Sequence, residues 1–182
     1  IGLMDGWSDI YIVELEDGAL TRLTHDPYDE RDPDWSPAGS VLAFSSDRRT
    51  TDLEYDDSTA FDYGPYNLYT VDVDTHAVAQ LTDHDAKDEY AAWSPDGSQL
   101  LFVSERSGVG NMYLLDAEGG ELTPVTDSLT GAQQIDWSGN GSKVVFSAFQ
   151  EGGYDLFLLD DPRTPPDGEK VAPTLTELAR RM

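Results

Sequence analysis

The sequence predicts an all-β fold, a β-propeller of four-stranded antiparallel blades. We expect about three full blade units, partial blades at both ends, and a short C-terminal helix. Three observations predict this: side chains that recur at fixed offsets, a spacing of 44 residues between two copies, and short strands separated by Pro- and Gly-containing turns. A period of about 40–45 residues is typical of a four-stranded propeller blade.

Each copy of the repeat has the same anchors. An Asp or Asn comes first (Asp9, Asn67 and Asn111), an apolar-Thr pair follows 14 residues later, and a Trp-Ser pair follows 26 residues later. A glycine stands four residues after each Trp and a Phe nine residues after it. The structural anchors are therefore Trp35, Trp93, Trp137, Gly39, Gly97, Gly141, Phe44, Phe102 and Phe146.

Each anchor has a predicted structural role. A Trp at the end of an inner strand is large enough to fill the wedge between neighbouring blades, and the Phe packs in the same layer. The opening Asp or Asn is expected to hydrogen-bond a turn backbone. The glycine accepts a positive φ at the end of a turn. In the second blade we expect strands at 91–94, 99–104, 111–115 and 122–126.

The motif Trp93-Ser94-Pro95-Asp96-Gly97, followed by Phe102-Val103-Ser104-Glu105-Arg106, Asn111-Met112-Tyr113 and, in the preceding unit, Leu81-Thr82, resembles the WD-like repeat of TolB-like propellers. It is also similar to the propeller domain of the prolyl oligopeptidase family. The resemblance covers residues 8–160 and implies the fold more strongly than the function, because one fold serves many functions. Two departures are Ala38 at the turn Asp and Phe149-Gln150 at the position of Glu105-Arg106.

The repeat also suggests how the chain is organised. Residues 1–160 form propeller blades with an insert at 49–65, and residues 161–182 form a linker and a short helical tail. Residues 8–24 read as the last two strands of one blade, and residues 132–160 as the first three of another. Since TolB-like propellers have about six blades, within the general range of ~4–8, we expect part of a longer polypeptide. The alternative is that chains pair to close the ring.

The composition is strongly acidic, with a formal net charge of −25. Such a surface repels phosphate backbones, which argues against nucleic-acid binding. No run approaches the ~20 apolar residues of a membrane-spanning helix. Three readings of the charge remain open: adaptation to salt, a cation-rich extracytoplasmic setting, and attraction to a basic partner.

No motif in the sequence points to catalysis. The nucleophile elbow Gly-x-Ser-x-Gly is absent, the three histidines have no metal-binding or triad spacing, and no Gly-rich phosphate loop precedes a helix. We therefore expect no catalytic residues, no cofactor and no enzyme activity for this chain.

Acidic loops are the candidates for a metal site. The runs 26–32 and 83–89 fall at equivalent positions, where one blade joins the next. Carboxylate oxygens suit Ca²⁺, so Asp83, Asp85 and Asp88 are candidate calcium ligands. Because both runs also contain a base and lack the glycine of an EF-hand loop, solvated charge is the competing interpretation.

The insert is the candidate partner contact, because long loops carry function and Tyr is enriched at interfaces. It interleaves aromatic residues with acids, and the predicted contact residues are Tyr55, Phe61, Tyr63 and Tyr66. The alternative is a loop without a partner.

The resemblance implies a non-catalytic protein-binding or scaffolding propeller of the bacterial cell envelope, periplasmic or otherwise extracytoplasmic, whose partners are proteins of a membrane-associated assembly. The alternative is the substrate-gating propeller of a larger serine peptidase with its catalytic domain outside this chain. A lectin-like propeller is less favoured, because aromatic clusters do not recur in the loops of every unit.

Overall fold

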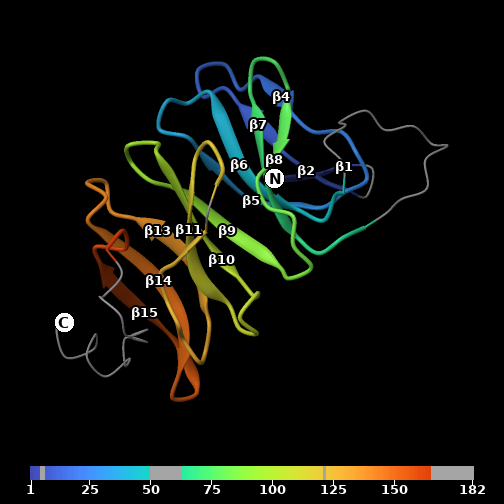
Figure 1. Ribbon diagram of the computed structural model, residues 1–182. Coiled ribbons are helices and arrows are strands. Elements are labelled where there is room, and N and C mark those ends of the chain that lie inside the picture. The colour runs from blue at the N-terminus through green and yellow to red at the C-terminus, as the bar shows by residue number, and fades with distance from the viewer. Residues whose placement is uncertain (5–6, 50–62, 121, 165–182) are drawn as a thin grey trace.

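The computed structural model describes residues 1–4, 7–49, 63–120 and 122–164 (Figure 1). Every regular element in these ranges is a β-strand, as the sequence predicts. None of the described residues belongs to a helix that could cross a membrane. The helix expected in the tail lies outside the described residues.

Two complete blades form the middle of the molecule. The first consists of β5 (Glu30–Trp35), β6 (Val41–Ser46), β7 (Asn67–Asp72) and β8 (Val78–Gln80). The second consists of β9 (Asp88–Trp93), β10 (Gln99–Ser104), β11 (Asn111–Asp116) and β12 (Thr123–Pro124). In both, sequence neighbours pair antiparallel, which confirms the predicted four-stranded blade.

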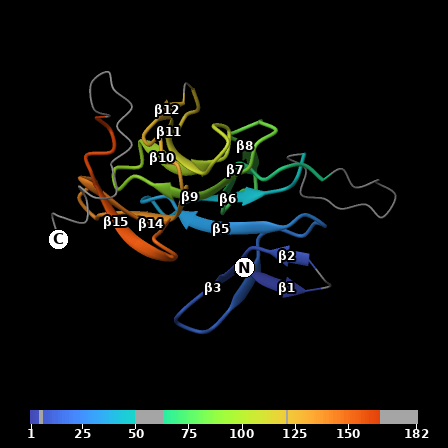
Figure 2. The same cartoon turned by 90° about the horizontal axis from the view of Figure 1, so that it is seen from below.

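Smaller sheets flank the two blades. At the start lie β1 (Gly2–Met4), β2 (Trp7–Asp9), β3 (Tyr11–Val13) and β4 (Leu20–Arg22), paired as β1–β2 and β3–β4. After β12 come β13 (Ala132–Trp137), β14 (Lys143–Gln150) and β15 (Gly153–Asp160), which form one three-stranded sheet. Figure 2 shows β1 and β2 beside β5, and β14 and β15 at the other end of the stack.

The sheets stand side by side, with β5, β9 and β13 as successive inner strands. Because the strands alternate in direction, the connections fall on two opposite faces. We call one the loop face, which carries the connections 24–29, 82–87, 105–110 and 126–131 and the described ends, 47–49 and 63–66, of the connection between β6 and β7. The other, the turn face, carries the tight turns such as 36–40, 94–98 and 138–142.

The tight turns use the same hydrogen bonds in all three repeats. The backbone N–H of Gly97 donates to the Ser94 carbonyl at 2.8 Å, and the N–H of Gln99 donates to Ser94 Oγ at 3.0 Å. Gly97 has φ +70°, a conformation that glycine adopts without a Cβ penalty. The turns at Gly39 and Gly141 repeat the pattern with φ +74° and +71°. These turns fix the register between the first and second strands.

The Phe anchors form the core of each sheet. Phe102 is fully buried and lies across from Tyr113 on the neighbouring strand, with ring centroids 6.1 Å apart. Equivalent cross-strand pairs join Phe44 to Tyr69 and Phe146 to Phe157. Because the pairs recur at the same register, each blade has one aromatic layer at its centre.

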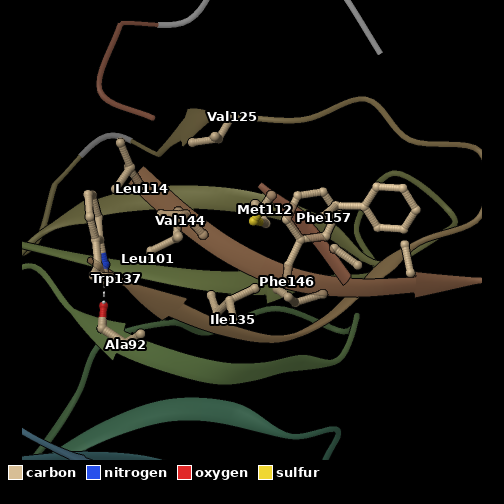
Figure 3. Packing of buried hydrophobic residues seen from close by; sticks show 13 residues of the cluster. Ala92, Leu101, Met112, Leu114, Val125, Ile135, Trp137, Val144, Phe146 and Phe157 are labelled. Carbon is tan, nitrogen blue, oxygen red and sulfur yellow. Dashed lines mark hydrogen bonds between the residues drawn. The ribbon is translucent and has the colours of Figure 1, made fainter. Parts of the chain in front are cut away.

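The largest apolar cluster lies between the second blade and the sheet β13–β15 (Figure 3). Trp137 belongs to the same cluster as Leu101 and Leu114 of the neighbouring blade, which lie beside it, and its Nε1–H donates to the Ala92 carbonyl at 3.2 Å. The indole therefore joins two sheets both by apolar contact and by a hydrogen bond.

The other two Trp anchors differ in burial. Trp93 packs against the cluster that holds Ala43 and Leu68 of the preceding blade. Trp35, in contrast, is 44% exposed. The pairing of Gly2 with Asp9 matches that of Ser46 with Asn67, so β1–β4 correspond to the outer part of a blade. Within the described residues, no inner strand of that blade lies against the Trp35 indole.

A threonine follows each outer strand and forms hydrogen bonds to the neighbouring strand. Thr82 Oγ1 accepts from the Leu68 N–H at 2.9 Å and donates to Asn67 Oδ1 at 3.2 Å. The same Asn67 oxygen accepts from the backbone N–H of His84 at 3.0 Å, which is the kind of bond expected for the anchor. Thr126 and Asn111 repeat the arrangement one blade later. The anchor pair thus ties the third strand to the fourth and to the loop beyond.

Each inner strand contains a β-bulge that the sequence did not predict. The register shifts near Asp32, Tyr90 and Gln134, and these three residues have φ of +49°, +57° and +51°. A left-handed conformation at a residue other than glycine costs about 1–3 kcal/mol. The bulge also lengthens the strand, so β9 begins at Asp88 rather than at the expected residue 91.

The buried threonine yields a prediction for stability. Thr82→Val leaves the Leu68 N–H and Asn67 Oδ1 without their shared partner, so we expect a loss of about 1–3 kcal/mol in the free energy of unfolding. Urea denaturation of the full chain measures it. Thr70→Val is the matched control on β7, because the Thr70 hydroxyl makes no hydrogen bond to the described residues. Equal stability of the two variants would contradict the role given to Thr82.

Candidate functional site

The loop face of the two complete blades gathers aromatic and charged side chains. At its centre, Tyr66 Oη donates to Asp29 Oδ2 at 2.5 Å. The Arg31 guanidinium lies 4.3 Å from the Tyr66 ring centroid and Lys87 Nζ lies 5.7 Å from it. Tyr66 is therefore held in the slot between the two blades by two cations and a carboxylate.

A network of ion pairs joins the two acidic loops around Tyr66. Arg31 contacts Asp29 at 2.7 Å and Glu89 at 3.5 Å, and Lys87 contacts Glu89 at 2.6 Å. Burial opposes ionisation of Asp29, yet hydrogen bonds from Tyr66, Ser8 and Arg31 hold its pKa below the ordinary value. The basic residues within these runs thus pair with their own acids.

A buried charge cluster lies beneath this surface. Arg48, which is 1% exposed, donates through Nη2 to Asp26 at 2.8 Å and to Glu30 at 2.6 Å. Thr24 Oγ1 also donates to Glu30, at 2.9 Å. One guanidinium thus serves two carboxylates. Burial and the neighbouring Asp26 raise the pKa of Glu30 to about 8, against the lowering effect of Arg48.

The next blade carries a simpler version of the cluster. Arg106 forms two bonds to the Asp88 carboxylate, at 2.9 and 3.1 Å, and one to Ser104 Oγ at 2.7 Å. Asp88 is fully buried. Because it bonds to Arg106, the Asp88 carboxylate does not join the other two candidate calcium ligands.

The remaining two calcium candidates do come together. Asp83 and Asp85 line a hollow of about 350 Å³ on the loop face, along with Arg48, Arg49 and His84. Both aspartates are exposed. Among the residues that the structure describes, no group of three or more His, Cys, Asp or Glu side chains is placed to hold a metal ion.

The predicted partner residues fall partly within the described chain. Tyr63 is 51% exposed and meets the edge of Tyr28, with ring centroids 5.9 Å apart. Tyr66 lies in the interblade slot described above. Tyr55 and Phe61 lie outside the described residues. The two visible tyrosines thus belong to one aromatic region of the loop face.

Sequence reasoning missed the cations of this region. Arg31 and Lys87 were read only as bases that weaken a calcium site, whereas they bracket Tyr66 and cross-link two loops. Arg48 and Arg106 could have been found, because both follow the Phe anchor by four residues. The third repeat has Gln150 there, and its hairpin instead continues to Gln150↔Gly153.

The last sheet presents an open apolar face. Leu156 and Leu158 of β15 are 70% and 37% exposed. The residues 44 positions earlier, Met112 and Leu114, are almost fully buried against the next sheet. The face that carries Leu156 therefore corresponds to an interblade surface without a neighbouring sheet among the described residues.

Antiparallel four-stranded sheets whose turn and interblade contacts recur from one repeat to the next define the β-propeller class built on WD-like repeats. Residues 58–163 match the family described as TolB beta propeller domain, and the chain belongs to this family. The matched range covers β7 and β8 of the first blade, the whole second blade, β13 to β15 and the start of the tail.

Two curated proteins are similar in sequence to part of this chain. An uncharacterized protein, Atu1656, from Agrobacterium fabrum is 32% identical over 103 residues, which are 57% of this chain and 30% of that protein. An uncharacterized peptidase, YuxL, from Bacillus subtilis is 32% identical over 94 residues, or 52% of this chain and 12% of that protein. The chain thus spans less than a third of either relative.

The structural comparisons support the fold. TolB from Acinetobacter baumannii superposes with a TM-score of 0.68 at 23% identity, covering 84% of this chain and 35% of TolB. Puromycin hydrolase superposes with a TM-score of 0.57 at 24% identity, covering 80% of this chain and 21% of the hydrolase. One propeller architecture thus occurs both in TolB and in a hydrolase.

The raised pKa of Glu30 predicts how stability depends on pH. Between its ordinary value of 4.5 and about 8, the folded state holds a proton that the unfolded state releases. The free energy of unfolding therefore falls as pH rises through this window. Glu30→Gln removes this contribution, so the variant should show a flatter pH dependence than the parent in urea titrations. Identical profiles for parent and variant would contradict the assignment.

Proposed function

We propose that this chain is a non-catalytic protein-binding propeller that receives its partner on the loop face. The observation that carries the proposal is the aromatic region of Tyr28, Tyr63 and Tyr66, set among cations and acids at the junction of two blades. Tyr and Arg are the residues most often enriched at protein interfaces. The rigid sheets beneath this region fix its shape before a partner binds.

The charge of the chain supports a partner with a basic surface. A net charge of −25 attracts cationic proteins at long range and speeds their association at low salt. We place the chain in the bacterial cell envelope, periplasmic or otherwise extracytoplasmic, within a membrane-associated assembly. This setting comes from kinship with TolB propellers. The open face at Leu156 and Leu158 would receive further blades of the same polypeptide or of a second copy.

A second candidate function is the gating propeller of a larger serine peptidase. It is favoured by one observation, the 32% identity to the peptidase YuxL over 94 residues. In that arrangement the propeller admits substrate and a separate hydrolase domain cleaves it. The complete reading frame that encodes this chain discriminates the two: a hydrolase domain after the blades supports gating, and an unrelated domain or a stop supports binding alone.

Site-specific cross-linking tests the proposed face. A photo-cross-linking amino acid in place of Tyr63 should form an adduct with a protein partner when the chain is mixed with native membranes and irradiated. The same amino acid in place of Ala38, on the turn face, is the control and should form none. If the yield of adducts from Ala38 matches or exceeds that from Tyr63, the partner does not bind specifically on the loop face and the proposal is refuted.

The proposal also predicts the behaviour of the purified chain toward substrates. Without a nucleophile elbow in the sequence, peptide and ester substrates should be hydrolysed no faster than in buffer. Chromogenic ester and dipeptide assays measure this directly. Hydrolysis that follows the chain through purification, and that is lost when the chain is unfolded, would overturn the non-catalytic assignment.

A further inference from the structure

A hollow of about 350 Å³ opens on the loop face between the second blade and the sheet β13–β15. We call it the Gly110 slot, and its lining includes Lys87, Glu89, Glu105, Gly110, Gly131 and Gln133. It adjoins the Tyr66 region, with which it shares Lys87 and Glu89, and it has no lining residue in common with the hollow at Asp83. Gly110 lies in the loop between β10 and β11 of the second blade, and Gly131 lies in the loop that joins this blade to the next sheet.

Comparison of the repeats explains why no side chain fills the Gly110 slot. Gly110 lies 44 residues after Tyr66 and makes the same backbone contact: the Tyr66 carbonyl accepts from Asp88 N–H at 2.8 Å, and the Gly110 carbonyl accepts from Ala132 N–H at 2.7 Å. Between the first two blades the Tyr66 ring fills the slot. Between the next two sheets glycine has no side chain to fill it.

The backbone around Gly110 keeps the slot open. A Cβ at Gly110 would lie 3.0 Å from Val103 Cγ1 and 3.2 Å from the Ala132 carbonyl oxygen, closer than most Cβ contacts. Gly131 faces it with φ +79°, a conformation that disfavours a side chain. Glycine at both positions therefore leaves this part of the hollow without a side chain.

At two equivalent positions, the side chains beside Tyr66 and those beside the Gly110 slot carry opposite charges. Arg31, which stacks on Tyr66, is replaced by Glu89 at the equivalent position, and Asp29, which accepts from the tyrosine hydroxyl, is replaced by Lys87. A carboxylate beside the ring position disfavours the negative face of an aromatic ring. A second tyrosine is therefore a poor occupant of the Gly110 slot.

One carboxylate of the slot is available to a cation. Glu89 is already paired with Lys87 at 2.6 Å and with Arg31 at 3.5 Å, whereas no ion pair joins Glu105 to another described residue. Burial and the neighbouring Glu89 and Asp32 carboxylates raise the pKa of Tyr90, which lines the same wall. Glu105 is exposed, so its carboxylate can meet an incoming group.

We propose that the Gly110 slot binds an arginine side chain from a basic segment of the protein partner. A guanidinium is planar like the phenol that fills the neighbouring slot, and its five donors match carboxylates and backbone carbonyls. The proposal rests on the proposed protein-binding function and adds the chemistry of recognition to it.

Peptide titration of the ¹⁵N-labelled full chain tests the slot. The probes are the blocked tripeptides acetyl-Gly-Arg-Gly-amide and its Lys, Tyr and Glu analogues. The Arg peptide should shift the backbone amide resonances of Gly108, Gly110 and Gly131 in a saturable way, with weaker shifts for Lys and none for Tyr or Glu. No saturable shift with the Arg peptide, or stronger binding of the Tyr peptide, would overturn the proposal.

Variants locate the binding in the slot. Gly110→Leu places an uncharged side chain in the slot and should abolish binding of the Arg peptide. Should that variant not fold, Glu105→Gln is a surface change that should weaken binding about threefold, the scale of one exposed ion pair. Glu118→Gln, an exposed acid on the turn face, is the matched control and should leave binding unchanged. Equal binding by Glu105→Gln and Glu118→Gln would contradict the slot.

The outcomes separate this inference from the proposed function. Cross-linking from Tyr63 without peptide binding removes the slot and leaves a protein-binding propeller. Peptide binding without a cross-linked partner removes the proposed loop-face contact and leaves an arginine-binding slot.

Discussion

Every sheet in this molecule depends on its neighbours, because four short strands cannot bury two apolar faces alone. The contact between Trp137 and the preceding blade shows the solution: the indole fills the space between sheets, and its N–H bonds to the Ala92 carbonyl. Where the described residues include no neighbouring sheet, residues at the equivalent positions are exposed to solvent. Trp35 at one end and Leu156 at the other are exposed, whereas Trp137 and Met112 at equivalent positions are buried. Stability is therefore shared between blades and is largest in the middle of the stack.

The sequence predicted the blade well because its strongest signals are local. The spacing of Trp93, Gly97 and Phe102 is fixed by one turn and one strand, so it survives in every copy. The bulges at Asp32, Tyr90 and Gln134 left no such signal, since residues of any type can occupy them. The exposure of Trp35 could not be predicted from its local sequence either, because burial of this indole depends on the inner strand of a neighbouring blade.

The candidate site was harder to predict, since it arises from contacts between repeats. Tyr66 was identified as a contact residue, but its partners Asp29 and Lys87 come from loops on either side of it. The same holds for Asp88, which looked like a metal ligand in the sequence and pairs with Arg106 in the fold. A run of acids shows charge but not which carboxylate faces a base. Only the register of the strands decides that.

The bulges allow the inner strands of the blades to differ in sequence. Among the described residues, nine glycines take a positive φ, yet Asp32, Tyr90 and Gln134 take it without being glycine. The sheet pairing around each bulge is kept with three unlike side chains, so no single residue type is required at this point. Each blade can therefore carry its own chemical group on its inner strand while the architecture stays the same.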